Sequence, residues 1–157
     1  MLQEIYDSSL GTSIREVGVL FPALESLHVI AITLVVGTIA VVDFRLIGVS
    51  SHRRSTNQLI HELLPFTWAA FALAVVTGVL LFTSKSIDYA ANIAFLCKLA
   101  VLALAGVNMA IFHLGVHRRI ASWDLAPTPP LAARMAGLLS LILWTAAIVL
   151  GRWIGFL

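Results

Sequence analysis

Four long apolar stretches, separated by short polar segments, fill most of the chain. They run over residues 22–48, 58–83, 92–116 and 131–156. A helix needs about 20 apolar residues to cross a hydrocarbon core about 30 Å thick. Each stretch reaches that length, and none alternates polar and apolar positions as a membrane strand would. The pattern therefore predicts an all-α, integral membrane four-helix bundle that forms one transmembrane domain over residues 1–157.

Residues 1–20 follow a different pattern, in which single apolar residues are separated by polar ones. This spacing predicts a short amphipathic helix that lies in the membrane interface. The acidic residues of the segment outnumber its one basic residue, Arg15, which is not typical of a signal peptide. The apolar positions are Ile5, Leu10, Ile14 and Val17.

Lysine and arginine are unequally divided between the two ends of the predicted bundle. Six arginines lie in or beside the loops after the first and third stretches, at positions 45, 53, 54, 118, 119 and 134. The opposite side holds only Arg15, Lys85 and Arg152. Cytoplasmic loops carry the excess of basic residues. We therefore expect both termini outside (N-out/C-out), in a multi-pass protein of the bacterial inner membrane.

Composition narrows the classes of function. Apolar residues make up 60% of the chain and charged residues 11%, whereas a soluble domain is about a quarter charged. The net charge of +2 comes from residues at membrane edges and predicts no nucleic-acid partner. With so little soluble surface, the function is expected to reside in ionisable residues inside the membrane, which are costly and usually functional.

Histidines near the cytoplasmic ends of two crossings form the first candidate site. Helix geometry places His61 and His113 at matching depth, and His117 follows His113 on the same face. Imidazoles from facing helices can ligate a haem iron from both sides, so His61 and His113 are candidate ligands of haem b. Trp68 lies on the same face as His61 and could pack on the porphyrin edge.

Two other interpretations of these histidines stay open. His61, His113 and His117 could together bind copper or another metal ion, since an open three-histidine site is chemically reasonable. They could also be interfacial side chains that hydrogen-bond between helices or reach toward the lipid head groups. His52, beside two arginines in the loop, is expected to be solvated.

A second group of polar residues lies near the outer ends of the crossings, and it comprises Glu25, His28, Lys98 and Arg152. A buried ammonium group needs a carboxylate, a carbonyl or an anionic ligand. Glu25 could pair with Lys98, or the group could form a pocket for a quinone head group or a haem propionate. His28 could also be a single axial haem ligand.

Two further polar positions are expected to be structural. Asp43 closes the first crossing at the cytoplasmic edge and is expected to form an ion pair with Arg45 or with a basic residue of a neighbouring helix. Asn108, inside the third apolar stretch, is expected to hydrogen-bond between helices, as polar side chains in membrane helices commonly do.

Several runs of the chain resemble a widespread group of uncharacterised four-helix bacterial membrane proteins. They include F-P-A-L-E-S-L-H at 21–28, H-E-L-L-P-F-T-W-A-A-F at 61–71, Y-A-A-N at 89–92 and A-G-V-N at 105–108. The pattern of His28 and Lys98 is also distantly similar to the haem-binding membrane protoporphyrinogen oxidase, in which a histidine and a lysine at these places matter. Lys98 with Asn108 is similar to the copper-resistance membrane domain.

The resemblance to the oxidase implies haem binding, but the chain lacks that enzyme's tryptophan-rich surroundings and adds His61 and His113. The leading hypothesis is a cytochrome-b-like protein that exchanges electrons with a quinone or a redox subunit, either as an oxidoreductase or as a membrane anchor. The alternatives are a metal-handling membrane protein and a structural subunit without a cofactor. Four short crossings enclose little volume, so a homo-oligomer or hetero-complex is expected.

Overall fold

The computed structural model describes residues 1–49, 55–124 and 128–156. His52, Arg53 and Arg54, on which some of the predictions above depend, lie outside these residues. All regular structure in the described ranges is helical. Four helices are long and apolar enough to cross a membrane. They are α3 (Leu20–Ile47), α4 (Thr56–Ser84), α6 (Ile93–Ile111) with its non-α continuation to Ser122, and α7 (Leu131–Trp153). The predicted helical membrane protein is confirmed, with helix bounds within a few residues of those expected.

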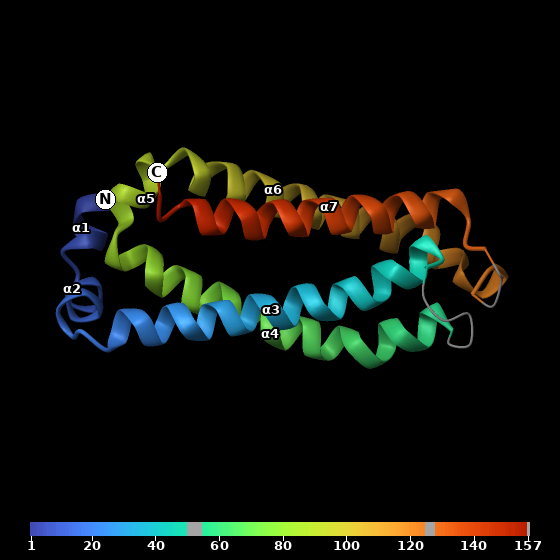
Figure 1. Ribbon diagram of the computed structural model, residues 1–157, viewed down its shortest axis with the longest axis horizontal. Helices are drawn as coiled ribbons and strands as arrows, with labels where there is room; N and C mark the ends of the chain where they lie inside the picture. The colour runs from blue at the N-terminus through green and yellow to red at the C-terminus, as the bar shows by residue number, and fades with distance from the viewer. Residues whose placement is uncertain (50–54, 125–127, 157) are drawn as a thin grey trace.

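The long helices form an elongated bundle with both chain termini at the same end (Figure 1). We call this the terminal end; it also carries α1 (Leu2–Tyr6), α2 (Ser9–Glu16) and α5 (Ser86–Ala91). The opposite end, where α3 leads toward α4 and α6 toward α7, is called the loop end. The backbone of α3 packs along α4, α6 packs along α7, and α3 with α7 joins the two pairs. In the described ranges α4 and α6 make no comparable backbone contact. At the terminal end their Phe82 and Phe95 rings stack at 5.6 Å, and nearer the loop end the bundle is open between them.

A close contact between α3 and α7 holds the two helix pairs together near the loop end. A Cβ atom on Gly137 would lie 3.0 Å from the Leu46 Cβ and 3.1 Å from the Asp43 carbonyl oxygen. Small residues allow membrane helices to approach this closely. The buried side chains of Leu46, Ile60, Phe112 and Ala133 form the apolar core of the same region. The firmest packing between the pairs therefore lies in the loop half of the bundle.

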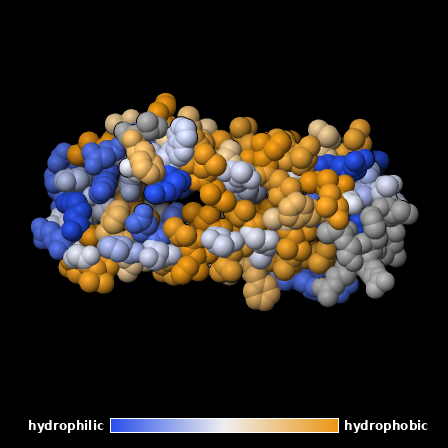
Figure 2. Space-filling view, viewed as in Figure 1, coloured by the Kyte–Doolittle hydropathy of each residue, from blue (hydrophilic) through white to orange (hydrophobic). Residues whose placement is uncertain are grey.

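The outward surface of the long helices is apolar. Val29, Leu34, Val76, Leu104 and Ile142 each expose more than half of their surface, at 56%, 52%, 57%, 56% and 56%. Figure 2 shows hydrophobic side chains over the middle of the bundle and hydrophilic ones gathered at the terminal end. A soluble monomer rarely exposes an apolar surface this large. The surface is suited to contact with lipid, and the chain is a multi-pass membrane protein.

The N-terminal segment forms two short helices where one was expected. The chain turns at Asp7, and Ser8 caps α2 by accepting a hydrogen bond at 3.1 Å from the Gly11 amide. A Cβ atom on Gly11 would lie 2.8 Å from the Thr83 carbonyl oxygen. Only glycine allows α2 to pack this tightly against the end of α4. The glycine that weakens α2 as an isolated helix is therefore the residue that lets it dock.

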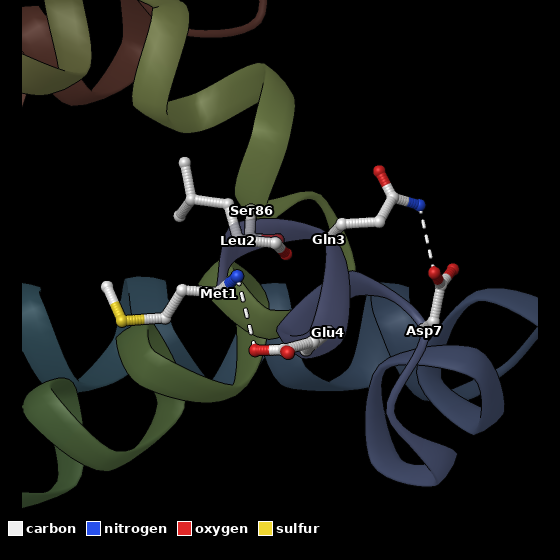
Figure 3. A network of polar contacts seen from close by, with 6 residues as sticks. All are labelled: Met1, Leu2, Gln3, Glu4, Asp7 and Ser86. Carbon is white, nitrogen blue, oxygen red and sulfur yellow. Dashed lines mark hydrogen bonds and ion pairs between the residues drawn. The ribbon is translucent and has the colours of Figure 1, made fainter.

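Polar contacts fasten these two helices to the terminal end. The Arg15 guanidinium donates hydrogen bonds to the carbonyl oxygens of Tyr6 and Ser84, at 2.8 and 3.0 Å. The Ser86 hydroxyl donates to the Leu2 carbonyl oxygen at 3.0 Å, and Figure 3 shows Ser86 of α5 beside Leu2. The segment is thus a cap over α4 and α5 and is fixed by hydrogen bonds as well as by apolar contacts.

Candidate functional site

A cavity of about 180 Å³ lies between α3, α4, α6 and α7. Its wall is mainly apolar, with a few polar side chains from all four helices. A smaller hollow between α4 and α6 is lined by Leu64, Trp68, Met109, Ala110 and His113, and it shares all of these residues except Ala110 with the cavity. We call this hollow the mouth. The polar residues of the cavity wall are Thr38, Asp43, Thr67, Asn108, His113 and Ser140.

His113 lies on a turn that is not α-helical. Residues Phe112–Val116 form a π-helical turn, and a 3₁₀-helical segment follows over His117–Ser122. Single π turns are rare and often mark functional sites, because the extra residue changes the direction of the side chains that follow. The sequence predicted one continuous helix to residue 116, and periodicity gives no sign of this change.

The hydrogen bond of His113 fixes which ring nitrogen carries the proton. Its Nδ1 lies 2.9 Å from the Met109 carbonyl oxygen. Since a carbonyl can only accept, Nδ1 is the donor and the neutral ring keeps the lone pair on Nε2. Metal-bound histidines commonly show this arrangement, in which the second nitrogen donates to a backbone carbonyl. His113 can therefore offer Nε2 to a ligand at the mouth.

The other two loop-end histidines lie around the mouth without lining it. The His117 ring centroid is 5.3 Å from that of His113, and the His117 Nε2 atom is buried without a hydrogen-bond partner. His61 is exposed and is one turn before Leu64 on the same face of α4. His61 and His117 are close enough to interact electrostatically.

No three His, Cys, Asp or Glu side chains are placed to hold a metal ion in the part of the chain that the structure describes. The three-histidine metal site at His61, His113 and His117 stays a prediction.

Trp68 lies where a flat ligand could contact it. It lines both the cavity and the mouth, and its ring meets that of Phe71 edge-on at 5.9 Å.

His28 belongs to a contact between α3 and α4 in the terminal half. Its Nδ1 lies 2.8 Å from the Thr77 Oγ1, and the Thr77 hydroxyl donates its only proton to the Leu73 carbonyl oxygen at 2.8 Å. The His28 Nδ1 is therefore the donor. A Cβ atom on Gly78 would lie 3.1 Å from the His28 Cε1, so the ring rests where α4 has no side chain.

The remaining outer residues are only partly brought together. Lys98 is near enough to His28 to interact electrostatically, and its Nζ lies against Gly151 of α7, 3.3 Å from where a Cβ atom would be. The Arg152 guanidinium stacks over the Phe156 ring at 4.8 Å. Within residues 1–49 and 55–124, Glu25 and Lys98 form no ion pair. The predicted pocket of Glu25, His28, Lys98 and Arg152 stays a prediction.

Glu25 instead interacts electrostatically with Tyr89 of α5, outside the crossing helices. Burial, Glu25 and Asp88 together raise the pKa of Tyr89 above its usual range. The Tyr89 ring packs with those of Phe82 and Phe95 in a triangular cluster, with centroid distances of 6.4 Å (Phe82–Tyr89), 5.5 Å (Tyr89–Phe95) and 5.6 Å (Phe82–Phe95). This aromatic stack joins α4, α5 and α6 at the terminal end.

Asp43 and Arg45 interact with different groups. Asp43 is 4% exposed and interacts with the Ser140 hydroxyl, while its Oδ2 atom has no hydrogen-bond partner. The Arg45 Nη2 donates to the Asp124 carbonyl oxygen at 3.0 Å. Side chains two positions apart on a helix do not face each other, which explains the separate contacts.

Asn108 confirms the expected hydrogen bond between helices. Its Nδ2 donates to the Ala136 carbonyl oxygen of α7 at 3.0 Å. The pattern of residues along the chain did not single out Ser140, Thr38 or Thr67 of the cavity wall. Their signal was weak, because a hydroxyl in a membrane helix can also donate to its own backbone, as Thr38 does to the Leu34 carbonyl oxygen at 2.9 Å.

Comparison with known proteins gives a family and no activity. No curated protein and no solved structure matches the chain. Residues 5–157 match the model of a family of unknown function, DUF6644. The match covers nearly the whole chain, including all four crossing helices. The chain therefore belongs to the family of unknown function DUF6644.

Proposed function

We propose that this chain is a cytochrome-b-like membrane protein that binds haem b at the mouth between α4 and α6. When bound, the haem would supply one-electron transfer between a quinone and a redox partner subunit. The observation that carries the proposal is His113, whose Nδ1–H group is held by the Met109 carbonyl oxygen at 2.9 Å. The ring thereby offers Nε2 at the edge of a cavity with apolar walls.

The opening between α4 and α6 supports this location. All other neighbouring pairs of crossing helices pack against each other, and this one is separated at the level of Leu64, Trp68 and Met109. A flat, apolar group that enters from the lipid would contact these side chains without displacing a packed helix. Bundle proteins commonly build cofactor sites between facing helices in this way.

His61 is the candidate for the second axial ligand. It precedes the mouth residue Leu64 by one turn of α4 and is close enough to His117 to interact with it electrostatically. Its ring is exposed, so it can turn toward a bound group without breaking a packed contact. With His61 and His113 both holding it, the group would supply electron transfer and would not activate oxygen.

Charge at the loop end is suited to the haem propionates. Arg118 and Arg119 lie one to two turns beyond His113 and are both exposed. Arginine binds carboxylates well, because its planar donors match their geometry. We place this end on the cytoplasmic side of a bacterial inner membrane, with both termini outside, because basic residues mark cytoplasmic loops.

The quinone would bind in the terminal half, beside His28 and Lys98. With Nδ1 as the donor to Thr77, the His28 ring can accept a hydrogen bond at Nε2, while the nearby Lys98 can donate one. A quinol hydroxyl and a quinone carbonyl have the matching groups. The N-terminal helices would then cap this half at the membrane interface, and the lipid-facing helix surfaces could also receive a second copy or a partner subunit.

The test is a reduced-minus-oxidised absorption spectrum of the protein purified from membranes with haem supplied during expression. We expect a b-type spectrum in the unmodified chain. His113→Ala and His61→Ala should each lose at least nine-tenths of the haem, while the control His28→Gln should keep it. Absence of a b-type spectrum in folded protein would refute the proposal. Loss of the spectrum only in the His28 variant would place the haem in the terminal half and refute the assignment of the ligands.

A further inference from the structure

The cavity wall outside the mouth contains a carboxyl group with an oxygen atom that has no hydrogen-bond partner. Asp43 is 4% exposed, it lines the cavity, and its Oδ2 atom has no hydrogen-bond partner. Burying an ionised carboxylate without a partner costs several kcal/mol. Acidic side chains in membrane helices usually face a partner, an ion or a water-filled space.

Two neutral oxygen atoms lie on the helices next to Asp43. The Ser140 hydroxyl on α7 interacts with the Asp43 carboxyl group. Asn108 of α6 donates its amide to the Ala136 carbonyl oxygen at 3.0 Å, one turn before Ser140 on the same face of α7. Its amide oxygen accepts no hydrogen bond from the residues described. All three residues line the same cavity.

The close contact of α3 with α7 fixes this arrangement. Gly137 lies between Ala136 and Ser140, and it brings α7 to within van der Waals reach of the Asp43 carbonyl oxygen. The three oxygen-bearing side chains therefore come from three different helices that meet at one level of the bundle. Their position depends on the helix packing, which makes the site rigid.

We propose that Asp43, Ser140 and Asn108 form a binding site for a small monovalent cation. Carboxylate, hydroxyl and amide oxygens are the ligands that hard cations prefer. No lysine or arginine is among the described residues that line the cavity. A single carboxylate balances one positive charge, whereas protein sites for divalent ions usually collect more acidic ligands. The cation is an alkali ion or an ammonium group, which bind through the same oxygen atoms.

This inference goes beyond the proposed electron transfer and does not require a haem. The cation would lie in the wall of the cavity that opens at the mouth, so occupancy of the mouth and of the cation site can affect each other. The experiment uses thermal unfolding of the purified full chain in detergent. Any ligand that binds only the folded state stabilises it by mass action.

The probes are sodium, potassium and ammonium chloride, each compared with choline chloride at the same ionic strength. We expect at least one of the three cations to raise the Tm in a saturable way. In Asp43→Asn the concentration for the half-maximal shift should rise at least tenfold, and in Ser140→Ala it should rise less. The control Asp88→Asn, which removes an exposed carboxylate of α5, should respond like the unmodified chain.

Three outcomes would overturn the proposal. The first is a Tm that is the same in all four salts. The second is a cation response that Asp43→Asn leaves unchanged. The third is a stability that varies with pH and with none of the cations, since Asp43 would then bind only a proton. If Asp43→Asn does not fold, Ser140→Ala decides the outcome, because a Ser140→Ala response equal to that of the unmodified chain also refutes the site. The haem spectrum of the same samples is scored separately, so either proposal can fail alone.

Discussion

His28 and His113 both donate a hydrogen bond from Nδ1, yet their surroundings differ. His28 donates to Thr77 of another helix and rests on Gly78, so protein contacts enclose its ring. His113 donates to the Met109 carbonyl of its own helix, and its ring lies at the mouth of the cavity. The first histidine joins two helices, and the second is available to a ligand.

The same difference separates the two halves of the bundle. In the terminal half, α1, α2 and α5 satisfy the ends of the long helices through Arg15 and Ser86. In the loop half, Asp43, Thr56, His117 and Trp123 each have a buried polar atom without a hydrogen-bond partner. Such atoms are few in native proteins, and each calls for an explanation such as a bound ion or a catalytic role. Polar groups inside this membrane protein point to a ligand mainly where the protein leaves them unsatisfied.

The largest expected effect comes from forcing the two helix pairs apart in the loop half. In Gly137→Val the new side chain would overlap Leu46 and the Asp43 carbonyl oxygen, which lie 3.0 and 3.1 Å from an added Cβ atom. Overpacking of this kind costs about 1–3 kcal/mol. Denaturant unfolding of the purified protein measures the loss. Gly37→Val, where an added Cβ atom meets nothing within 4 Å, is the matched control, and an equal loss there would show that the loop half is not held by this contact.

A smaller effect on the free energy of unfolding should distinguish His28 from His113. His28→Gln removes the ring that fits between Thr77 and Gly78, and hydrogen bonds between membrane helices contribute about 0.6 kcal/mol on average. His113→Gln removes no contact between helices and should leave the free energy of unfolding of the haem-free protein unchanged. Both are measured by unfolding in the same detergent. Equal destabilisation by the two variants would contradict the division into a structural and a ligand-binding histidine.

The smallest effect concerns Tyr89 at the terminal end, and it appears only in alkali. Burial, Glu25 and Asp88 raise the pKa of Tyr89 in the folded chain, whereas a tyrosine in the unfolded chain has a pKa of about 10. Above that pH the unfolded state loses the proton first, so the folded state binds more protons and the free energy of unfolding falls as pH rises. Tyr89→Phe should remove this part of the fall. Measurement of stability against pH in both chains checks the sign, and a fall of the same size in Tyr89→Phe would contradict it.

Apolar length alone was enough to predict the four crossing helices, because lipid requires every spanning segment to satisfy its own backbone. Depth along each helix follows from residue number, so His61 and His113 could be assigned to one end before the structure was known. The partner of Asn108 could be anticipated as another helix, and the structure identifies it as the Ala136 carbonyl oxygen. Residue spacing could not give the separate contacts of Asp43 and Arg45, which depend on the positions of α7 and of the chain near Asp124.

The sequence by itself determined that this is a helical membrane protein, and which of its ionisable residues lie within the apolar helices, since both follow from the hydrophobic pattern along the chain. Tertiary structure decided which of those residues are enclosed. The opening between α4 and α6, the π turn at Phe112–Val116 and the contact at Gly137 arise from how the helices pack. In lipid, helix packing depends on the fit of side chains and on hydrogen bonds between helices, which a one-dimensional pattern of apolar residues does not record.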